Sequence, residues 1–106
     1  MRPSRPRGGA KISARLDIFY ADGGSKSVRL AGVRTTIGRA GDNAVPLSDP
    51  VVSGRHAEIV AQEDGFLLRD LGSSNGTFVN GQAVTETPLY AGDEIVVGTT
   101  RLVLGE

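Results

Sequence analysis

Residues 14–30 read ARLDIFYADGGSKSVRL, and this stretch decides the class of fold. At its start, apolar side chains occupy every second position, with Arg15 and Asp17 in between. A period of two places successive side chains on opposite faces of a β-strand. A glycine-rich turn at residues 21–24 follows, and residues 28–30 give a second short strand. The stretch therefore predicts two neighbouring strands joined by a turn.

The same pattern continues to the end of the chain. No window long enough for a helix carries an apolar stripe at helical spacing, and fifteen glycines are spread over the 106 residues. Asn75-Gly76 and Asn80-Gly81 are typical of turns with positive φ. We expect about ten short strands, which favours an all-β antiparallel sandwich or barrel. Beyond residue 30, the strands are expected at 33–37, 44–47, 57–61, 66–71, 77–79, 83–84, 94–97 and 100–104.

The composition argues against several classes of function. Twelve basic residues balance twelve acidic ones, so a nucleic-acid partner is not expected. The absence of cysteine excludes a disulfide scaffold, a thiolate metal site and a cysteine nucleophile. With one histidine and no cluster of carboxylates, we expect no metal and no cofactor. There is neither a membrane-spanning run nor a secretory signal, so we expect a small, soluble, cytoplasmic monomer without membrane insertion.

The first thirteen residues differ in composition from the rest. They carry four basic residues among prolines and glycines, and no acidic residue. Such a segment buries too little apolar surface to offset the entropy of ordering. We therefore expect a flexible basic tail over residues 1–13 and one folded domain over residues 14–106. A basic arm for an acidic partner or nucleic acid is the alternative, but no aromatic residue interleaves the arginines.

A catalytic site has little support in the sequence. His56 follows Ser53 by three residues, but a triad also needs an orienting acid and an oxyanion hole. Residues 72–76 match the G-x-S-x-G pattern of a nucleophile elbow. That elbow lies at a strand-to-helix turn and takes its histidine from later in the chain. Here a strand-like segment follows and no later histidine exists, so we expect no enzyme activity.

Polar residues instead gather in three segments between apolar strands. These segments are Gly38-Arg39, residues 53–56 and residues 73–76. If the loops meet at one end of a sandwich, an arginine fork, several hydroxyl groups and an asparagine converge. Arginine binds phosphate bidentately, hydroxyls donate to phosphate oxygens, and an asparagine amide matches the donor and acceptor of an extended backbone. This combination suits a phosphorylated peptide.

Four short motifs occur in a characteristic order and spacing. Together they resemble the forkhead-associated (FHA) domain family, over about residues 14–104. The resemblance implies an eleven-stranded sandwich of two twisted, mainly antiparallel sheets, with recognition loops at one end that bind phosphothreonine in an extended peptide. The motifs are Ile37-Gly38-Arg39, then Ser53-x-x-His56-Ala57, then Asp70-Leu71-x-Ser73-x-Asn75-Gly76-Thr77-x-x-Asn80-Gly81, and finally Gly92-Asp93-x-Ile95.

The resemblance also assigns roles to motif residues. Arg39 would contact the phosphate or the nearby peptide backbone, and Ser53 would donate its hydroxyl to a phosphate oxygen. Ser74 would support the phosphothreonine, and Asn75 would hold the peptide backbone on either side of it. The residues that would belong to the scaffold of the motif are Gly38, His56, Gly76, Asn80 and Gly81.

One position departs from the commoner pattern of the family. The residue after the motif serine is often Lys, Arg or Asn, whereas here it is Gly54. Either the backbone N–H of Gly54 contributes to phosphate binding alone, or the neighbouring Arg55 compensates. Arg55 is equally compatible with a solvated face, and Arg39 with a surface ion pair to an acid such as Asp42.

The resemblance implies a phosphothreonine-binding adaptor that recruits a protein phosphorylated by a Ser/Thr kinase, with the kinase itself or its substrate as partner. The alternative is an FHA-fold scaffold that binds a protein partner independently of phosphate. The complete set of Arg39, Ser53 and Asn75 argues against the scaffold, whereas Gly54 leaves it open.

Overall fold

A computed structural model describes residues 14–106, so the tail expected over residues 1–13 lies outside the described residues. The described chain forms eleven strands and no helix. The strands are β1 (Arg15–Phe19), β2 (Ser25–Arg29), β3 (Arg34–Gly38), β4 (Val45–Pro46), β5 (Ala57–Gln62), β6 (Gly65–Asp70), β7 (Thr77–Val79), β8 (Gln82–Val84), β9 (Glu86–Leu89), β10 (Glu94–Val97) and β11 (Thr100–Gly105).

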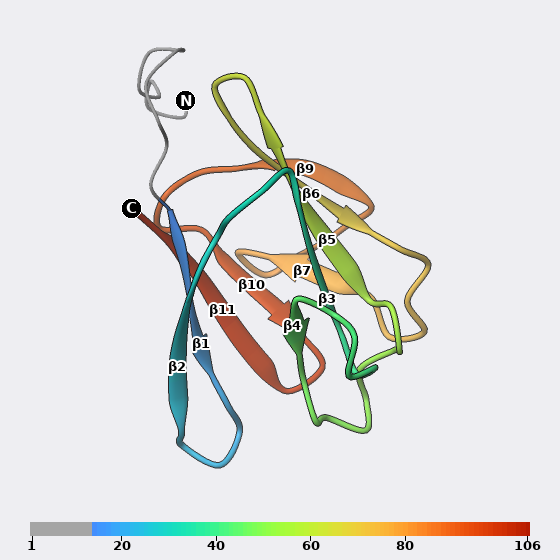
Figure 1. Cartoon of the computed structure of the whole chain (residues 1–106). Helices are drawn as coiled ribbons and strands as arrows, with labels where there is room; N and C mark the ends of the chain where they lie inside the picture. Colours follow the sequence, from blue (N-terminus) through green and yellow to red (C-terminus); the bar gives the residue numbers. More distant parts are fainter. Residues whose placement is uncertain (1–13) are drawn as a thin grey trace.

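Two sheets pack against each other as a sandwich (Figure 1). The six-stranded sheet has the order β2-β1-β11-β10-β7-β8, and the five-stranded sheet has the order β4-β3-β5-β6-β9. Only the short β3–β4 pair is parallel among the strand pairs of the described residues. The expected sandwich of two mainly antiparallel sheets is confirmed.

The core lies between the sheets and follows the period-two pattern of the sequence. In β1, Leu16 and Ile18 are buried while Arg15 is exposed. Removing such aliphatic side chains from water contributes about 1.5–3 kcal/mol each, so the alternation fixes which face of each strand points inward. Facing residues from the other strands complete this core, among them Ile37, Ile59, Leu68, Ile95 and Leu102.

The residue pattern alone missed β9 and overestimated the length of β4. It also placed β2 at residues 28–30, whereas the strand spans Ser25–Arg29. In β9 only Leu89 is buried, and Pro88 interrupts the pattern that would identify a strand. Because β9 is an edge strand that pairs only with β6, the missing N–H of Pro88 leaves no gap in the sheet. Strand β4 is only Val45–Pro46, shorter than the expected 44–47.

Three loops meet at one end of the sandwich, which we call the loop end. They are the β3–β4 loop (residues 39–44), the β4–β5 loop (residues 47–56) and the β6–β7 loop (residues 71–76), low and to the right in Figure 1. The first and last strands instead bring Arg15 beside Gly105, at the opposite end. The sheets thus present the polar segments picked out in the sequence on one common surface.

Candidate functional site

Backbone hydrogen bonds fasten the three loops to one another. The N–H of Arg39 donates to the carbonyl of Ser53 over 2.9 Å, which joins the β3–β4 loop to the β4–β5 loop. The N–H of Leu71 donates to the carbonyl of His56, also over 2.9 Å, which joins the β4–β5 loop to the β6–β7 loop. The loop end is therefore a single hydrogen-bonded surface.

His56 is fully buried beneath this surface, and its ring links the β4–β5 loop to the β6–β7 loop. Its Nδ1 accepts from the backbone N–H of Ser53 over 3.1 Å. The ring proton therefore sits on Nε2, which donates to the carbonyl of Gly76 over 2.8 Å. Both ring nitrogens are used structurally, so His56 has no nitrogen left for proton transfer to a ligand.

Gly38 ends β3 at a point of very close approach between loops. A Cβ at this position would lie 2.2 Å from the carbonyl oxygen of Gly54 and 2.9 Å from Nδ2 of Asn43. No side chain fits there, so the close approach of the loops explains why residue 38 is a glycine.

Ser53 and Ser74 face each other across two loops. The backbone N–H of Ser74 donates to Oγ of Ser53 over 3.0 Å. Because this bond occupies an acceptor position of the Ser53 hydroxyl, the hydroxyl proton remains available to a ligand. Ser53 is half-buried and Ser74 is exposed.

Arg39 is exposed, and its guanidinium is anchored at one corner only. Its Nε donates to the carbonyl of Val52 over 3.0 Å. Within residues 14–106, neither terminal nitrogen of Arg39 has a hydrogen-bond or carboxylate partner. The arrangement presents a fixed, unpaired arginine fork beside Ser53, and the surface ion pair considered for Arg39 does not form.

Asn75 is held in the same manner by the neighbouring carbonyl of the β4–β5 loop. Its Nδ2 donates to the carbonyl of Val51 over 2.8 Å. Its Oδ1 has no partner among the described residues, so an acceptor beside one remaining amide proton faces solvent. An extended backbone that passes over Asn75 would find one acceptor and one donor.

Arg55, unlike Arg39, is paired. Its Nη2 contacts Oδ2 of Asp42 at 2.6 Å and its Nη1 contacts Oδ1 of Asn43 at 3.0 Å. The hydrogen bond and the charge of Arg55 hold the pKa of Asp42 below its usual value. Gly54 lies next to it, and a Cβ there would meet nothing within 4 Å. The Gly54 position is thus open, while Arg55 is engaged by a neighbouring acid.

The β6–β7 loop is shaped by the carboxylate of Asp70, which receives four hydrogen bonds. The Ser73 hydroxyl donates over 2.5 Å and the Thr77 hydroxyl over 2.7 Å, and the backbone N–H groups of Gly72 and Ser73 also donate. Burial raises the pKa of Asp70, but these bonds outweigh it and leave the pKa below its usual value. Asp70 is therefore an ionised anchor for the loop that carries Ser74 and Asn75.

The two Asn-Gly pairs behave differently. Asn80 and Gly81 have φ of 50° and 87° and form the two-residue turn between β7 and β8, as the sequence predicted. The Asn80 side chain also donates to Asp93. In the other pair only Gly76 has positive φ, at 90°. Asn75 is thereby left free to present its side chain outward.

Comparison with known proteins identifies the family. The FHA domain model matches residues 35–98. The chain belongs to the FHA domain family. The match includes all four motifs. Gly38-Arg39 and residues 53–56 and 73–76 lie at the loop end. Asn80-Gly81 and Gly92-Asp93 lie at the other end of β7 and β10, where the Asn80 side chain donates to Asp93.

Among curated proteins, this FHA domain is 43% identical over 72 residues to an oxoglutarate dehydrogenase inhibitor of Corynebacterium diphtheriae, covering 68% of this chain and 50% of that protein. It is 44% identical over 69 residues to the glycogen accumulation regulator GarA of Mycobacterium tuberculosis, covering 65% of this chain and 43% of that protein. The chain spans about half the length of the curated relatives it matches.

Solved FHA domains share the whole sandwich. The FhaA FHA domain, solved in complex with the intracellular domain of Rv3910, superposes with a TM-score of 0.80 at 37% identity and covers 87% of this chain and 99% of that chain. A structure from a study of phosphothreonine-dependent FHA domain interactions gives a TM-score of 0.78 at 35% identity, covering 87% and 96%.

The described residues carry neither of two other kinds of site. Residues 14–106 contain no group of three or more histidine, cysteine or acidic side chains placed to hold a metal ion. The same residues contain no helix long and apolar enough to cross a membrane.

Sequence reasoning missed two side chains that build the loop end. Asn43 is buried, and its Nδ2 donates to the carbonyls of Ala40 and Gly54 while its Oδ1 accepts from Arg55. Asp70 was noted as part of a motif but not as the anchor of the β6–β7 loop. Its spacing of three residues to Ser73 and seven to Thr77 is a signal that could have indicated this role.

Proposed function

We propose that this FHA domain is a phosphothreonine reader that recruits a phosphorylated partner protein. The observation that carries the proposal is the fork of Arg39, anchored through Nε with both terminal nitrogens unused, beside the Ser53 hydroxyl. A phosphate group brings a charge close to −2 and three acceptor oxygens, which match these donors.

Each exposed group has a part in this binding mode. Arg39 donates to the phosphate or the adjacent peptide backbone, and Ser53 donates its hydroxyl proton to a phosphate oxygen. Ser74 supports the phosphothreonine from the β6–β7 loop. Asn75 holds the peptide backbone through Oδ1 and its free amide proton. Gly54 adds its backbone N–H.

Arg55 contributes less directly than Arg39 in this proposal. Its guanidinium is shared with Asp42 and Asn43, so a direct contact with phosphate requires exchange of those partners. Its charge still lies next to Gly54 and adds to the local positive potential. The scaffold residues of the motif act through the side-chain hydrogen bonds and the turn geometry described above: Gly38, His56, Gly76, Asn80 and Gly81.

Recruitment rather than catalysis fits the groups at the loop end. The single histidine has both nitrogens engaged, and the acids nearest the site are tied in hydrogen bonds or an ion pair. Two of the relatives are named as an inhibitor and a regulator. We infer that the whole protein acts in regulation downstream of a Ser/Thr kinase, with the kinase or its substrate as partner.

A phosphate-independent scaffold is the second candidate. Two observations favour it: position 54 has no side chain to offer, and the arginine beside it is neutralised by Asp42. A scaffold would keep its partner after phosphatase treatment, whereas a reader would lose it. The unpaired fork of Arg39 argues for the reader.

The proposal is tested by fluorescence anisotropy with a degenerate phosphothreonine peptide pool and its unphosphorylated twin. Arg39→Ala should weaken binding roughly ten- to a hundredfold, because a charge-assisted hydrogen bond contributes about 1.5–3 kcal/mol. Arg34→Gln is the matched control. It removes the same charge at the far end of β3, where Glu58 keeps Arg69 as a partner.

Three results would count against the reader. Binding that is equal with and without phosphate, or unchanged in Arg39→Ala, contradicts it. So does equal binding of peptides in which aspartate replaces phosphothreonine, since a carboxylate supplies less charge and fewer acceptors. Sequencing the peptides retained by the wild-type domain would give the sequence preference of the partner.

A further inference from the structure

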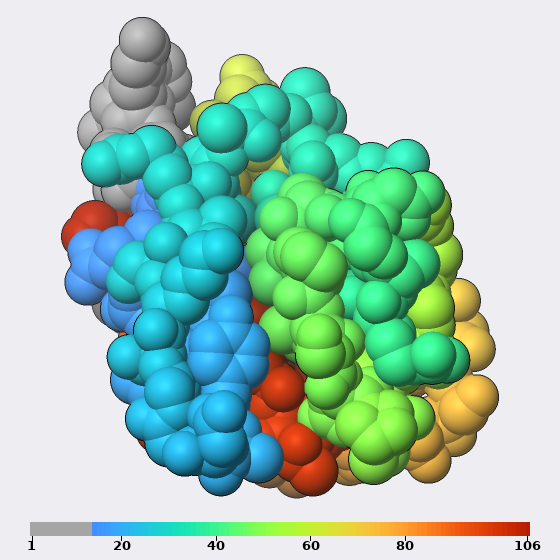
Figure 2. Space-filling view, turned by 60° about the horizontal axis from the view of Figure 1, so that its bottom comes forward, coloured from blue at the N-terminus to red at the C-terminus, as the bar shows by residue number. Residues whose placement is uncertain are grey.

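A cleft opens between the two sheets at the loop end, on the other side of the β4–β5 loop from Asn75. Its volume is about 440 Å³. Figure 2 shows the loop end turned forward, with the hollow between the β1–β2 segment in blue and the β4–β5 loop in green, and residues near 100 in red at its base.

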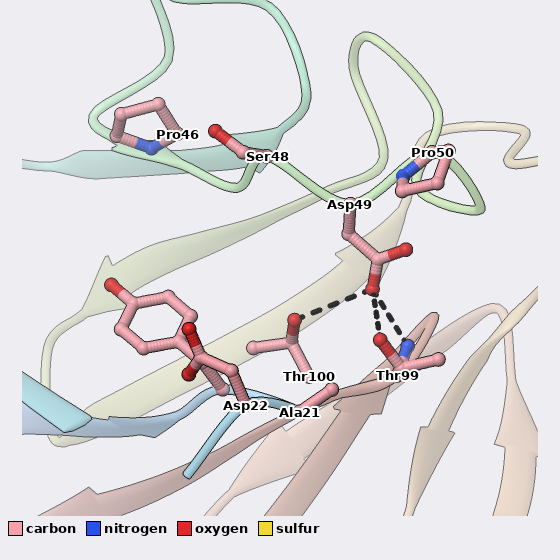
Figure 3. A pocket seen from close by; sticks show the side chains of 9 residues that line it. Ala21, Asp22, Pro46, Ser48, Asp49, Pro50, Thr99 and Thr100 are labelled. Carbon is pink, nitrogen blue, oxygen red and sulfur yellow. Dashed lines mark hydrogen bonds between the residues drawn. The ribbon is translucent and has the colours of Figure 1, made fainter. Parts of the chain in front are cut away.

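The two walls come from different sheets. In Figure 3, Ser48, Asp49 and Pro50 form one wall, while Asp22 and Thr100 lie across from them. The first wall belongs to the β4–β5 loop, and the second comes from the β1–β2 turn and the start of β11. The lining combines proline rings, hydroxyl groups and carboxylates.

Asp49 gives this cleft a buried negative charge. The residue is only 7% exposed. Its Oδ2 accepts from the N–H and hydroxyl of Thr99, and its Oδ1 accepts from the N–H of Val51. These bonds, the Thr99 hydroxyl above all, hold the pKa of Asp49 below its usual value. No lysine or arginine of the described residues pairs with it, so its charge has no cationic partner.

Asp22 adds a second carboxylate on the opposite wall, and this one is exposed. Its only hydrogen bond within the described chain is accepted by Oδ1 from the N–H of Gly24, so it too lacks a cationic partner. Tyr20 lines the same cleft. An aromatic ring and two unpaired carboxylates form an environment that favours a guanidinium or ammonium group.

The turn of residues 49–52 separates the cleft from the proposed phosphate site. The N–H of Val52 donates to the carbonyl of Asp49 over 2.9 Å and closes this turn. On one side, the carbonyls of Val51 and Val52 hold Asn75 and Arg39. On the other side, Asp49 lines the cleft. An extended peptide that is held by Asn75 and crosses the turn reaches the cleft within a few residues.

We propose that this cleft is a subsite for a basic side chain, arginine or lysine, that follows the phosphothreonine contact along the same partner peptide. The inference rests on the proposed function for the position of that peptide, but the chemistry of the cleft stands on its own residues. The partner would thus be recognised by a phosphate on one side of residues 49–52 and a cation on the other.

The first test uses phosphothreonine peptides in an alanine background, in which one arginine is moved stepwise along both flanks. Citrulline, which is neutral and has nearly the same shape, replaces arginine in a parallel series. At one position the arginine peptide should bind about threefold to tenfold more tightly than its citrulline twin, the range for a partly exposed ion pair with a ring contact.

Asp22→Asn should reduce that preference, because it removes the exposed one of the two charges and keeps the Oδ1 acceptor for Gly24. Glu63→Gln is the matched control. It removes an exposed acid from the β5–β6 turn, at the opposite end of the sandwich, and should keep the preference. The subsite is overturned if no position prefers arginine, or if Asp22→Asn retains the full preference.

The second test needs no phosphate. N-acetylarginine methylamide is titrated into the domain while amide resonances are followed by NMR. The amides of Gly24 and Thr99 should shift in the wild type and much less in Asp22→Asn. If these shifts occur but no phosphopeptide binds, the proposed function fails and the cation site stands. If phosphopeptides bind but neither preference nor shifts occur, the subsite fails and the proposed function stands.

Discussion

Two arginines at the loop end have the same charge and different partners. Arg39 gives only its Nε to the backbone, whereas Arg55 gives both terminal nitrogens to Asp42 and Asn43. Binding an anion requires donors that are held in place and still unused. Arg39 meets both conditions and Arg55 meets only the first, so the two side chains are not interchangeable in the proposed site.

Gly54 offers a way to strengthen phosphate binding. A Cβ there meets nothing within 4 Å, and its φ lies outside the left-handed region, so a side chain is accommodated without strain. We expect Gly54→Lys to tighten binding of a phosphothreonine peptide by about threefold to tenfold, the range for an exposed ion pair. Gly54→Gln, of similar length and no charge, should bind as the wild type does. Equal binding by all three proteins in an anisotropy titration would contradict this placement of the phosphate.

The role of a single residue was predictable from the sequence where a short motif contains it. It was not predictable where the hydrogen-bond partner lies far away in the sequence. Gly38 and His56 stand in motifs whose spacing marks them. Asn43 bonds to the carbonyl of a residue eleven positions later, and Asp49 bonds to Thr99, fifty positions later. No local pattern reports such contacts. The cleft beside Asp49 could therefore be found only in the structure.

Among the elements, β3 and the β4–β5 loop depend on each other through one close approach. Gly38 at the end of β3 lies against the carbonyl of Gly54. The strands themselves follow from alternation, and all of them except β9 were expected near their observed positions. The exception combines a single buried side chain with a proline, which shows that an edge strand can lack the alternation that identifies central strands.

Gly38→Ala should push the β4–β5 loop away from the end of β3. The new Cβ would lie 2.2 Å from the Gly54 carbonyl, so the loop must shift, and we expect a loss of about 1–3 kcal/mol in the free energy of unfolding. The displaced loop should also weaken phosphopeptide binding. Gly41→Ala in the same β3–β4 loop, where a Cβ meets nothing within 4 Å, is the control and should have little effect. Urea unfolding that gives equal stability for both variants would contradict the steric argument.

For the molecule as a whole, carboxylates held by several hydrogen bonds link stability to pH. Asp49 and Asp70 have pKa values lowered from about 3.8, Asp49 chiefly through the Thr99 hydroxyl and Asp70 through hydrogen bonds that outweigh burial. A group whose pKa is lower in the folded state stabilises the fold above its unfolded pKa. That contribution is lost as the pH falls through the folded value. The β4–β5 loop and the β6–β7 loop therefore depend for their stability on two carboxylates, Asp49 and Asp70, that are ionised in the folded domain.

We expect the free energy of unfolding to change little between about pH 7 and pH 5 and to fall below about pH 4. Asp70→Asn should be less stable than the wild type at neutral pH, since an amide nitrogen cannot accept from Gly72 and Ser73. The gap between the two proteins should narrow as the pH drops below 4. Urea titrations over a pH series measure it, and a gap that stays constant would show that ionised Asp70 is not a source of the acid sensitivity.

The pairing of Arg15 with Gly105 places both ends of the sandwich strands side by side, at the end opposite to the loops. A polypeptide joined after Glu106 therefore starts at that far side, away from the ligand surface. A fluorescent reporter fused after Glu106 would leave the loop end open, which makes this the natural point of attachment for a phosphorylation biosensor.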